Sequence, residues 1–411
     1  MKLLLAYPPT PYLVNPDAQT GLGLLYLATL VRDLGAEVEV RRLRSVVLKD
    51  ADCDALLLTG CTIDEPALAA VAASAKEAGV PFVAVGGPVA DHPKWERGVG
   101  PFDAVIRGPG EPFIERLMAK GPEPGFCEIP DDQPFDRWPF PDRRLLGGET
   151  GGNIFHPKAG AGTRSTTLLT ARGCRHRCAF CRSGGRGFRH EYHWDRLCDE
   201  LDAIERLGIS DVRITDDSVT ADQGRLETLC SVLPVRKLRW RASSRAVGDW
   251  QVWRRVAEAG CLEVNIGIES GDPAVLRAIR KGSTVAAGHA AVDAAREAGL
   301  HVRALFMTGT PGETEETLAL NKQWVERHPD ATVCLTSFVP FPGTAIWREP
   351  ERFGVRIEIQ SGNASFYSFR PDGSEPEAHL SIVGGMTRDA LTANLREFRR
   401  WLIERGQHNE G

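Results

Sequence analysis

Three cysteines lie close together near the middle of the 411-residue chain: Cys174, Cys178 and Cys181, with three and then two residues between them. At this spacing the three thiols can converge on one face of a loop. Four ligands close a tetrahedral zinc site, and four cysteines commonly hold an iron–sulfur cluster. Three thiolates therefore leave one position open. It can take a non-protein ligand of a cluster, or a distant fourth protein ligand if the metal is zinc.

The composition excludes several other classes of protein. A hydrophobic content of 42% is enough for two or three domain cores, and a net charge of −5 gives no basic surface for nucleic acid. The cysteines outside the trio form no paired framework. No secretory leader and no apolar run long enough to span a bilayer is visible. We therefore expect a cytoplasmic protein in a reducing environment.

The first third of the chain alternates between short apolar strands and helices, which predicts a parallel sheet covered on both faces. The strands are expected at 2–7, 36–42, 55–60, 81–87 and 102–107, with helices at 21–35, at 65–78 and after residue 111. Ligands of such sheets bind beyond the carboxyl ends of the strands. Here those ends carry Cys61-Thr62, Gly86-Gly87 and residues 108–111.

The second half alternates again and predicts six strands with helices between them, the pattern of a partial (β/α)₆ barrel. The strands are expected at 166–170, 211–215, 237–242, 262–268, 301–307 and 332–339. The helices are expected at 195–207, 223–233, 249–259, 273–279, 284–298, 315–327 and 386–405. Polar residues gather where the strands end, as in the active sites of barrels.

The cysteine trio resembles the cluster motif of the radical S-adenosylmethionine (SAM) superfamily, and Phe180 matches its aromatic position. In that family three cysteines hold a [4Fe–4S] cluster, and SAM chelates the open iron and is cleaved to a 5′-deoxyadenosyl radical. Ile-Glu-Ser-Gly at 268–271 and Ile-Arg-Lys-Gly at 279–282 resemble SAM-binding stretches of the family. The resemblance implies SAM contacts from Phe180, Asp216, Asp217, Ser243, Arg245, Glu269, Ser270 and Lys281.

The first domain resembles the flavodoxin-like cobalamin-binding domain found ahead of many radical SAM cores. The shared segments are Gly-Leu-Leu-Tyr-Leu-Ala at 23–28, Val-Gly-Gly at 85–87, Arg-Gly-Pro-Gly-Glu at 107–111 and Pro-Phe-Pro-Asp at 139–142. No Asp-x-His-x-x-Gly motif offers a histidine to the lower face of cobalt. The resemblance implies cobalamin contacts from Cys61, Thr62, Gly86, Gly87, Gly108 and Glu111. The alternative is a domain of the same shape that binds no corrin.

Together these resemblances imply an α/β protein with four parts: a cobalamin-binding-like domain at 1–125, a linker at 126–165, a radical SAM barrel at 166–345 and a substrate-covering extension at 346–411. They imply a C-methyltransferase that acts on an unactivated carbon of a small molecule. One SAM would regenerate methylcobalamin, and a second would generate the radical that activates the substrate. The alternatives are a rearrangement or cyclisation without methyl transfer, and a non-catalytic iron–sulfur or corrinoid-binding sensor.

Two further expectations concern the surroundings of the site. Six arginines would give the cluster loop a positive field for an acidic electron donor such as flavodoxin or ferredoxin. They are Arg172, Arg175, Arg177, Arg182, Arg186 and Arg189. An ordinary solvated basic loop explains these arginines equally well. Phe366, Tyr367 and Phe369 of the extension are expected to pack or to contact substrate.

Overall fold

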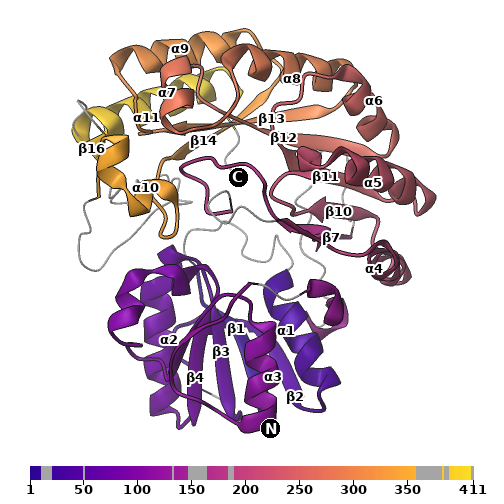
Figure 1. Cartoon of the computed structure of the whole chain (residues 1–411), viewed down its shortest axis with the longest axis vertical. Helices are drawn as coiled ribbons and strands as arrows, with labels where there is room; N and C mark the ends of the chain where they lie inside the picture. Colours follow the sequence, from indigo (N-terminus) through magenta and orange to yellow (C-terminus); the bar gives the residue numbers. More distant parts are fainter. Residues whose placement is uncertain are drawn as a thin grey trace.

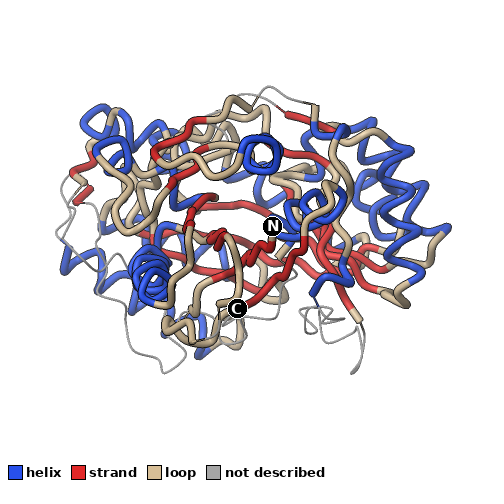
Figure 2. Tube along the Cα trace, turned by 90° about the horizontal axis from the view of Figure 1, so that it is seen from below, coloured by secondary structure: helices blue, strands red, loops and turns tan. Residues whose placement is uncertain are grey.

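The computed structural model describes residues 1–10, 21–49, 51–131, 134–146, 164–183, 189–357, 382–383 and 388–408. Two six-stranded sheets dominate these residues, one in each half of the chain. In Figure 1 the first sheet and its helices form the lower half of the molecule and the second sheet forms the upper half. Figure 2, seen from below, places strands in the middle and many of the helices toward the periphery.

The first sheet is parallel, with the strand order β2-β1-β3-β4-β5-β6. Its strands are β1 (Lys2–Tyr7), β2 (Glu37–Arg42), β3 (Ala55–Thr59), β4 (Phe82–Gly86), β5 (Ala104–Arg107) and β6 (Gly125–Glu128). The helices are α1 (Leu22–Asp33), α2 (Glu65–Glu77) and α3 (Glu111–Lys120). Leu3 and Leu5 enter one buried cluster, and Leu4 and Ala6 enter another. Because alternate residues point to opposite faces, both faces of the sheet are covered.

The second sheet is also parallel, and its order β14-β13-β12-β11-β10-β7 follows the chain. Its strands are β7 (Ser165–Leu168), β10 (Asp211–Ile214), β11 (Arg239–Ser244), β12 (Cys261–Glu269), β13 (His301–Thr308) and β14 (Thr332–Ser337). The helices are α4 (Trp194–Arg206), α5 (Gln223–Val235), α6 (Trp250–Glu258), α7 (Pro273–Ala278), α8 (Val285–Glu297) and α9 (Glu315–Glu326). The predicted α/β class, with a flavodoxin-like sheet and a six-stranded partial barrel, is confirmed.

Among the differences between the structure and the predicted elements, three lie near the domain boundary or in the barrel. β6 lies where the sequence predicts the start of an irregular linker, and it pairs with β5. The third barrel strand begins at Arg239 rather than at 237, because Lys237 adopts a left-handed conformation with φ of 53°. The three-residue strands β8 (Ala171–Gly173) and β9 (Arg189–Glu191), which pair in antiparallel fashion beside the cysteine loop, are not predicted at all.

The C-terminal helix α11 (Arg388–Glu404) packs on the outside of the barrel, against α9, β13 and β14. Its Phe398 and Leu402 are buried in the barrel core, and Phe398 lies edge-on to Phe306 at 6.2 Å between ring centroids. This helix therefore completes the outer helical layer. The substrate-covering role expected for the extension stays a prediction, because residues 358–381 lie outside the described part. Phe366, Tyr367 and Phe369 lie outside the described residues, as does the glycine-rich segment 147–162.

Candidate functional site

The cysteine loop follows β8 and is fixed by backbone hydrogen bonds to two distant segments. The amide of Ala179 donates to the carbonyl oxygen of Ile279 at 2.9 Å, at the end of α7. The amide of Ile346, in α10 (Ala345–Arg348), donates to the carbonyl oxygen of Ala179 at 3.2 Å. Cys174 and Cys178 are buried, and Cys181 is half-buried. The loop is thus held over the carboxyl-terminal side of the barrel, with its thiols inside the protein.

The surroundings of the loop are positively charged. The Arg245 guanidinium donates a hydrogen bond to the Cys178 sulfur at 3.1 Å, and it also bonds the carbonyl oxygen of Lys281. The pKa of His176, within the loop, is lowered by desolvation and by the charges of Arg245 and Lys281. Cationic neighbours favour the thiolate form of cysteine, which is the form that binds metals. The donor set and its electrostatics therefore fit an iron–sulfur cluster.

The described residues contain no group of three His, Cys, Asp or Glu side chains that could hold a single metal ion. A cluster takes its cysteines at separate iron atoms, so its ligands need not converge on one point.

Lys281 and Glu269 form a buried ion pair beside this loop. The Lys281 Nζ lies 2.6 Å from Glu269 Oε1, and the two side chains are 6% and 9% exposed. Glu269 has a φ of 68°, in the left-handed region, at a register shift between β12 and β13. A Cβ on Gly267 would lie within 2.7 Å of both charged groups, so only glycine leaves room for the pair. The Lys281 ammonium also lies 5.9 Å from the centre of the Phe180 ring.

The other residues that the sequence analysis assigns to SAM fall into two groups. Asp216 and Ser270 are buried and bonded within the protein. Asp216 accepts hydrogen bonds from Thr170 and Ala171, and Ser270 donates to Asn321 at 3.0 Å. Asp217 is exposed and accepts from Ser183 at 2.7 Å, and Ser243 is half-buried. Only the second group is open to a ligand.

A cavity of about 550 Å³ lies between the carboxyl ends of the first sheet and the barrel. Four of the residues that the sequence analysis assigns to cobalamin line it: Gly86, Gly87, Gly108 and Glu111. Cys61 and Thr62 are absent from its lining and lie at the 3₁₀ turn η1 (Thr62–Asp64). Much of the wall is formed by residues that the sequence does not single out, on α1, on β3 and at the barrel positions Leu169, Arg172 and Thr215.

Two glycines leave open space in the wall of the cavity. Gly23 and Gly86 both line it, and neither has a positive φ. A Cβ on Gly23 would meet no atom within 4 Å, and one on Gly86 would make only ordinary contacts, with a nearest atom at 3.5 Å. The protein's own packing therefore does not require glycine at these positions. Larger side chains there would instead reduce the space available to a ligand, so the residues fit a corrin.

A second cavity, of about 250 Å³, connects this region to the cysteine loop. It shares Gly87, Gly108 and Arg172 with the large cavity, and its remaining lining includes Arg182 and Ser183 just after Cys181. The two cavities therefore bring the first sheet and the cysteine loop to one continuous region of the molecule.

Arg172 crosses the boundary between the two halves. It pairs with the buried Glu111 at the start of α3 at 3.0 Å, and its guanidinium lies 3.8 Å from the centre of the Phe135 ring. Burial opposes its charge, but the attraction of Glu111 and of nearby tyrosines raises the pKa of Arg172 above its usual value. The pair joins the wall of the cavity to the strand that precedes the cysteines.

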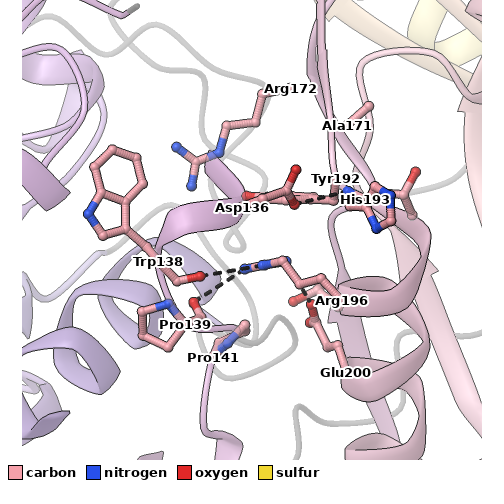
Figure 3. Close-up of polar contacts among 12 residues, drawn as sticks. Asp136, Trp138, Pro139, Pro141, Ala171, Arg172, Tyr192, His193, Arg196 and Glu200 are labelled. Atoms are coloured by element: carbon pink, nitrogen blue, oxygen red, sulfur yellow. Dashed lines mark hydrogen bonds and ion pairs between the residues drawn. The ribbon is translucent and has the colours of Figure 1, made fainter. Parts of the chain in front are cut away.

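The segment 134–146 ties the two halves together (Figure 3). Arg196 of α4 donates to the carbonyl oxygens of Trp138 and Pro139, at 3.4 and 3.2 Å. The Asp136 carboxylate accepts the amide hydrogen of His193 at 2.9 Å. These contacts attach the segment to the barrel.

The same segment is buried against the barrel and bonded to the first domain. Arg143 forms an ion pair with Glu200 at 2.7 Å, and these side chains are only 3% and 0% exposed. The amide of Asp142 donates to Thr29 Oγ1 of α1 at 2.8 Å. The predicted position of Pro-Phe-Pro-Asp between the domains thus has a physical cause, because this segment bonds to both of them.

The positive field expected around the cysteines is partly neutralised. Arg172, Arg175 and Arg182 pair with Glu111, Asp222 and Asp91, the Arg175 pair at 3.6 Å. Arg177 is exposed. Arg186 and the side chain of Arg189 lie outside the described part.

Comparisons with known proteins agree with this geometry. Residues 168–323 match the model of the radical SAM superfamily. The chain contains a radical SAM domain. The fold outside that domain is also similar to a solved structure, so that the structural match covers nearly the whole chain. The structure of TsrM, a radical S-adenosylmethionine methyltransferase from Kitasatospora setae with cobalamin and a [4Fe–4S] cluster bound, has a TM-score of 0.70 at 18% identity. The match covers 97% of this chain and 91% of that one.

The likeness to other relatives also extends beyond residues 168–323. OxsB, a cobalamin-dependent S-adenosylmethionine radical enzyme solved with aqua-cobalamin and SAM, has a TM-score of 0.62 at 18% identity, over 86% of this chain and 56% of that one. An uncharacterised methyltransferase of Pyrococcus horikoshii is 29% identical, over 84% of this chain and 82% of its own length. Cytidylyl-2-hydroxyethylphosphonate methyltransferase of Streptomyces wedmorensis is 27% identical over 60% of this chain, which spans 49% of that relative.

These findings confirm the resemblance to cobalamin-dependent radical SAM enzymes and the prediction of an enzyme similar to methyltransferases. In the part of the chain that the structure describes, no helix is long and apolar enough to cross a membrane.

Proposed function

We propose that the chain is a cobalamin-dependent radical SAM enzyme that transfers a methyl group to a carbon atom of a small molecule. The observation that carries the proposal is the cavity of about 550 Å³ whose wall combines the strand ends of the first sheet with barrel residues beside the cysteine loop. Two cofactors held on opposite sides of one space can act on a single substrate. This arrangement accounts for two domains joined by a bonded segment.

Each part of the proposed site is assigned to residues of this chain. Cys174, Cys178 and Cys181 hold the cluster, and Arg245 donates a hydrogen bond to the Cys178 sulfur. Lys281 supplies the cation that pairs with the carboxylate of SAM, and Glu269 holds Lys281 in place until then. Phe180, Asp217 and Ser243 complete the SAM site. Gly86, Gly87, Gly108 and Glu111 form the cobalamin site.

The bound cofactors supply the reactive chemistry: the cluster with SAM supplies hydrogen-atom abstraction, and cobalamin supplies the methyl group. The protein contributes position and exclusion of water. The Arg172–Glu111 pair and the segment 134–146 fix the distance between the two halves. An external donor such as flavodoxin or ferredoxin would deliver electrons at the loop, where Arg175 and Arg177 are exposed.

The proposal is tested by anaerobic purification, reconstitution with iron and sulfide, and addition of cobalamin. We expect a retained corrin absorbance, and cleavage of SAM when dithionite is added. Cys178→Ala should lose most of its iron and its SAM cleavage, whereas Cys198→Ala, outside the loop, should keep both. A Cys178→Ala protein that still cleaves SAM would refute the cluster assignment. A product without a transferred methyl group would favour the rearrangement or cyclisation alternative.

A further inference from the structure

The interior of the barrel is polar and in contact with solvent. Along β13, residues alternate between half-buried and buried from His301 to Thr308. The buried set, which includes Val302, Ala304 and Phe306, belongs to the core beneath the helices. The half-buried set therefore faces the lumen and keeps part of its surface exposed to solvent.

Three arginines face this lumen, and two of them pair with the same carboxylate. Arg241 of β11 lies 2.9 Å from Glu263 of β12, and Arg303 of β13 lies 3.7 Å from the same oxygen. His301 approaches the other oxygen of Glu263 at 3.8 Å. The third arginine is Arg213 of β10, which is paired in register with Arg241. It faces the lumen because its neighbours Val212 and Ile214 enter the helix-facing core.

Arg213 is the unusual member of the group. Its guanidinium makes no hydrogen bond and no ion pair with any residue that the structure describes, and its side chain is half-buried. Burial lowers the pKa of Arg213 to about 10, and repulsion from Arg241 and Arg303 adds to the effect. Arg241 and Arg303 share the Glu263 carboxylate, and Arg213 has no ion pair of its own in the described part of the chain, so Arg213 adds positive charge to the lumen. Buried charges are normally paired, because desolvation is costly.

A further polar atom nearby also lacks a partner. The side-chain oxygen of Asn265, one layer above Glu263 on β12, is buried without a hydrogen-bond partner in the described part of the chain. Nearer the surface at the end of β10, Thr215 lines the large cavity. Two residues of strand separate it from Arg213, or roughly 6–7 Å. The positive lumen therefore lies directly beneath the proposed reaction space.

We propose that Arg213, together with Arg241 and Arg303, binds a compact oxyanion of the substrate, a carboxylate or a phosphate-type group. A planar guanidinium with free N–H groups matches either one in bidentate fashion. The anion anchors one end of the substrate in the lumen, so that its reacting carbon lies near the strand ends. This assignment of the substrate class rests on the proposed function, but the anion site itself is defined by residues of the barrel alone.

The experiment measures the thermal unfolding midpoint of the full-length protein with inorganic phosphate or acetate, against potassium chloride at equal ionic strength. Without added oxyanion, Arg213→Gln should raise the midpoint by roughly 2 °C or more, because it removes an unpaired buried charge. Phosphate or acetate should raise the midpoint of the wild type, and this shift should disappear in Arg213→Gln. Arg213→Lys keeps the positive charge but loses the planar guanidinium with its paired N–H donors, so it should retain part of the oxyanion-induced shift in the unfolding midpoint. The anion with the larger effect identifies the preferred group.

The control is Arg254→Gln, since Arg254 has a 54% exposed side chain on α6. It should leave the oxyanion shift unchanged. The proposal is overturned if Arg213→Gln keeps the full shift, or if it lowers the midpoint without anion, which would make Arg213 a structural residue. Neither readout needs cobalamin or cleavage of SAM. A wild type that shows the Arg213-dependent shift but binds no corrin would therefore refute the proposed function and leave the anion site standing.

Discussion

The buried ion pair between Lys281 and Glu269 gives the most direct quantitative test of the site. At their separation of 2.6 Å, the attraction is about 6 kcal/mol for an effective dielectric constant near 20. Desolvation of both groups offsets much of this attraction, so the net value of the pair is small. Removing one partner is different, because the other charge then remains buried and uncompensated. Such changes cost about 3–5 kcal/mol.

Lys281→Met should therefore lower the free energy of unfolding by about 3–5 kcal/mol, measured by urea denaturation with tryptophan fluorescence. The double variant Glu269→Gln/Lys281→Met should recover most of this loss, because neither charge remains. Lys322→Met is a matched control: Lys322 also lies 2.6 Å from its partner Glu397, but that side chain is 57% exposed. Its cost should stay below about 1 kcal/mol.

The reasoning is refuted if Lys281→Met costs no more than Lys322→Met, or if the double variant is no more stable than the single one. Binding of SAM supplies an independent readout. The double variant should stay folded yet bind SAM at least tenfold more weakly by equilibrium dialysis, because the cation for the SAM carboxylate is gone. Unchanged affinity would remove Lys281 from the proposed SAM site.

Three further predictions follow from other parts of the molecule. Gly86→Leu should abolish retention of cobalamin after gel filtration, because its side chain enters the cavity, whereas Ala73→Leu on the exposed face of α2 should retain it; equal retention would refute the cavity assignment. His328 is fully buried, and desolvation lowers its pKa from 6.5 to about 4. As the pH falls, the His328 side chain therefore takes up a proton in the unfolded state before it does so in the folded state. The free energy of unfolding should fall by up to about 3 kcal/mol between pH 6.5 and pH 4. Urea titrations of His328→Gln should show a weaker dependence of this free energy on pH, and an unchanged dependence would show that His328 is not its cause. Arg172→Met should leave Glu111 buried without its cation and weaken cobalamin retention, while the double variant Glu111→Gln/Arg172→Met should recover stability in the same urea assay; no recovery would argue against the pair.

Much of the fold follows from sequence periodicity. Runs such as Leu3–Ala6 and Leu56–Leu58 are apolar at every position, and both faces of these strands are indeed buried. Such runs specify a doubly covered parallel sheet. The short strands β6, β8 and β9 were missed because three or four residues show too little periodicity to be separated from a loop. Their pairing is imposed by neighbouring strands rather than by their own sequence.

Candidate site residues could be predicted where they lie close together in the sequence. Contacts between residues from distant segments could not. The cysteine trio is visible from spacing alone. Glu269 and Lys281 were assigned separately to SAM, and nothing in the sequence shows that they neutralise each other across a register shift. Asp216 is buried and bonded by Thr170, so its prominent position in the sequence reflects the closure of a turn.

The direction in which the lumen arginines point follows from the sequence pattern around them. Arg213, Arg241 and Arg303 each stand between two apolar residues in strands that the alternation with helices predicts to be buried. A charge at such a position cannot face the helices, so it must face the interior of the barrel. The sequence alone does not reveal that Glu263 pairs with Arg241 and Arg303 but not with Arg213, because those pairings depend on the register between β10, β11, β12 and β13. Since a fully satisfied network would need no ligand, the missing counter-charge is the feature that connects this part of the barrel to a substrate.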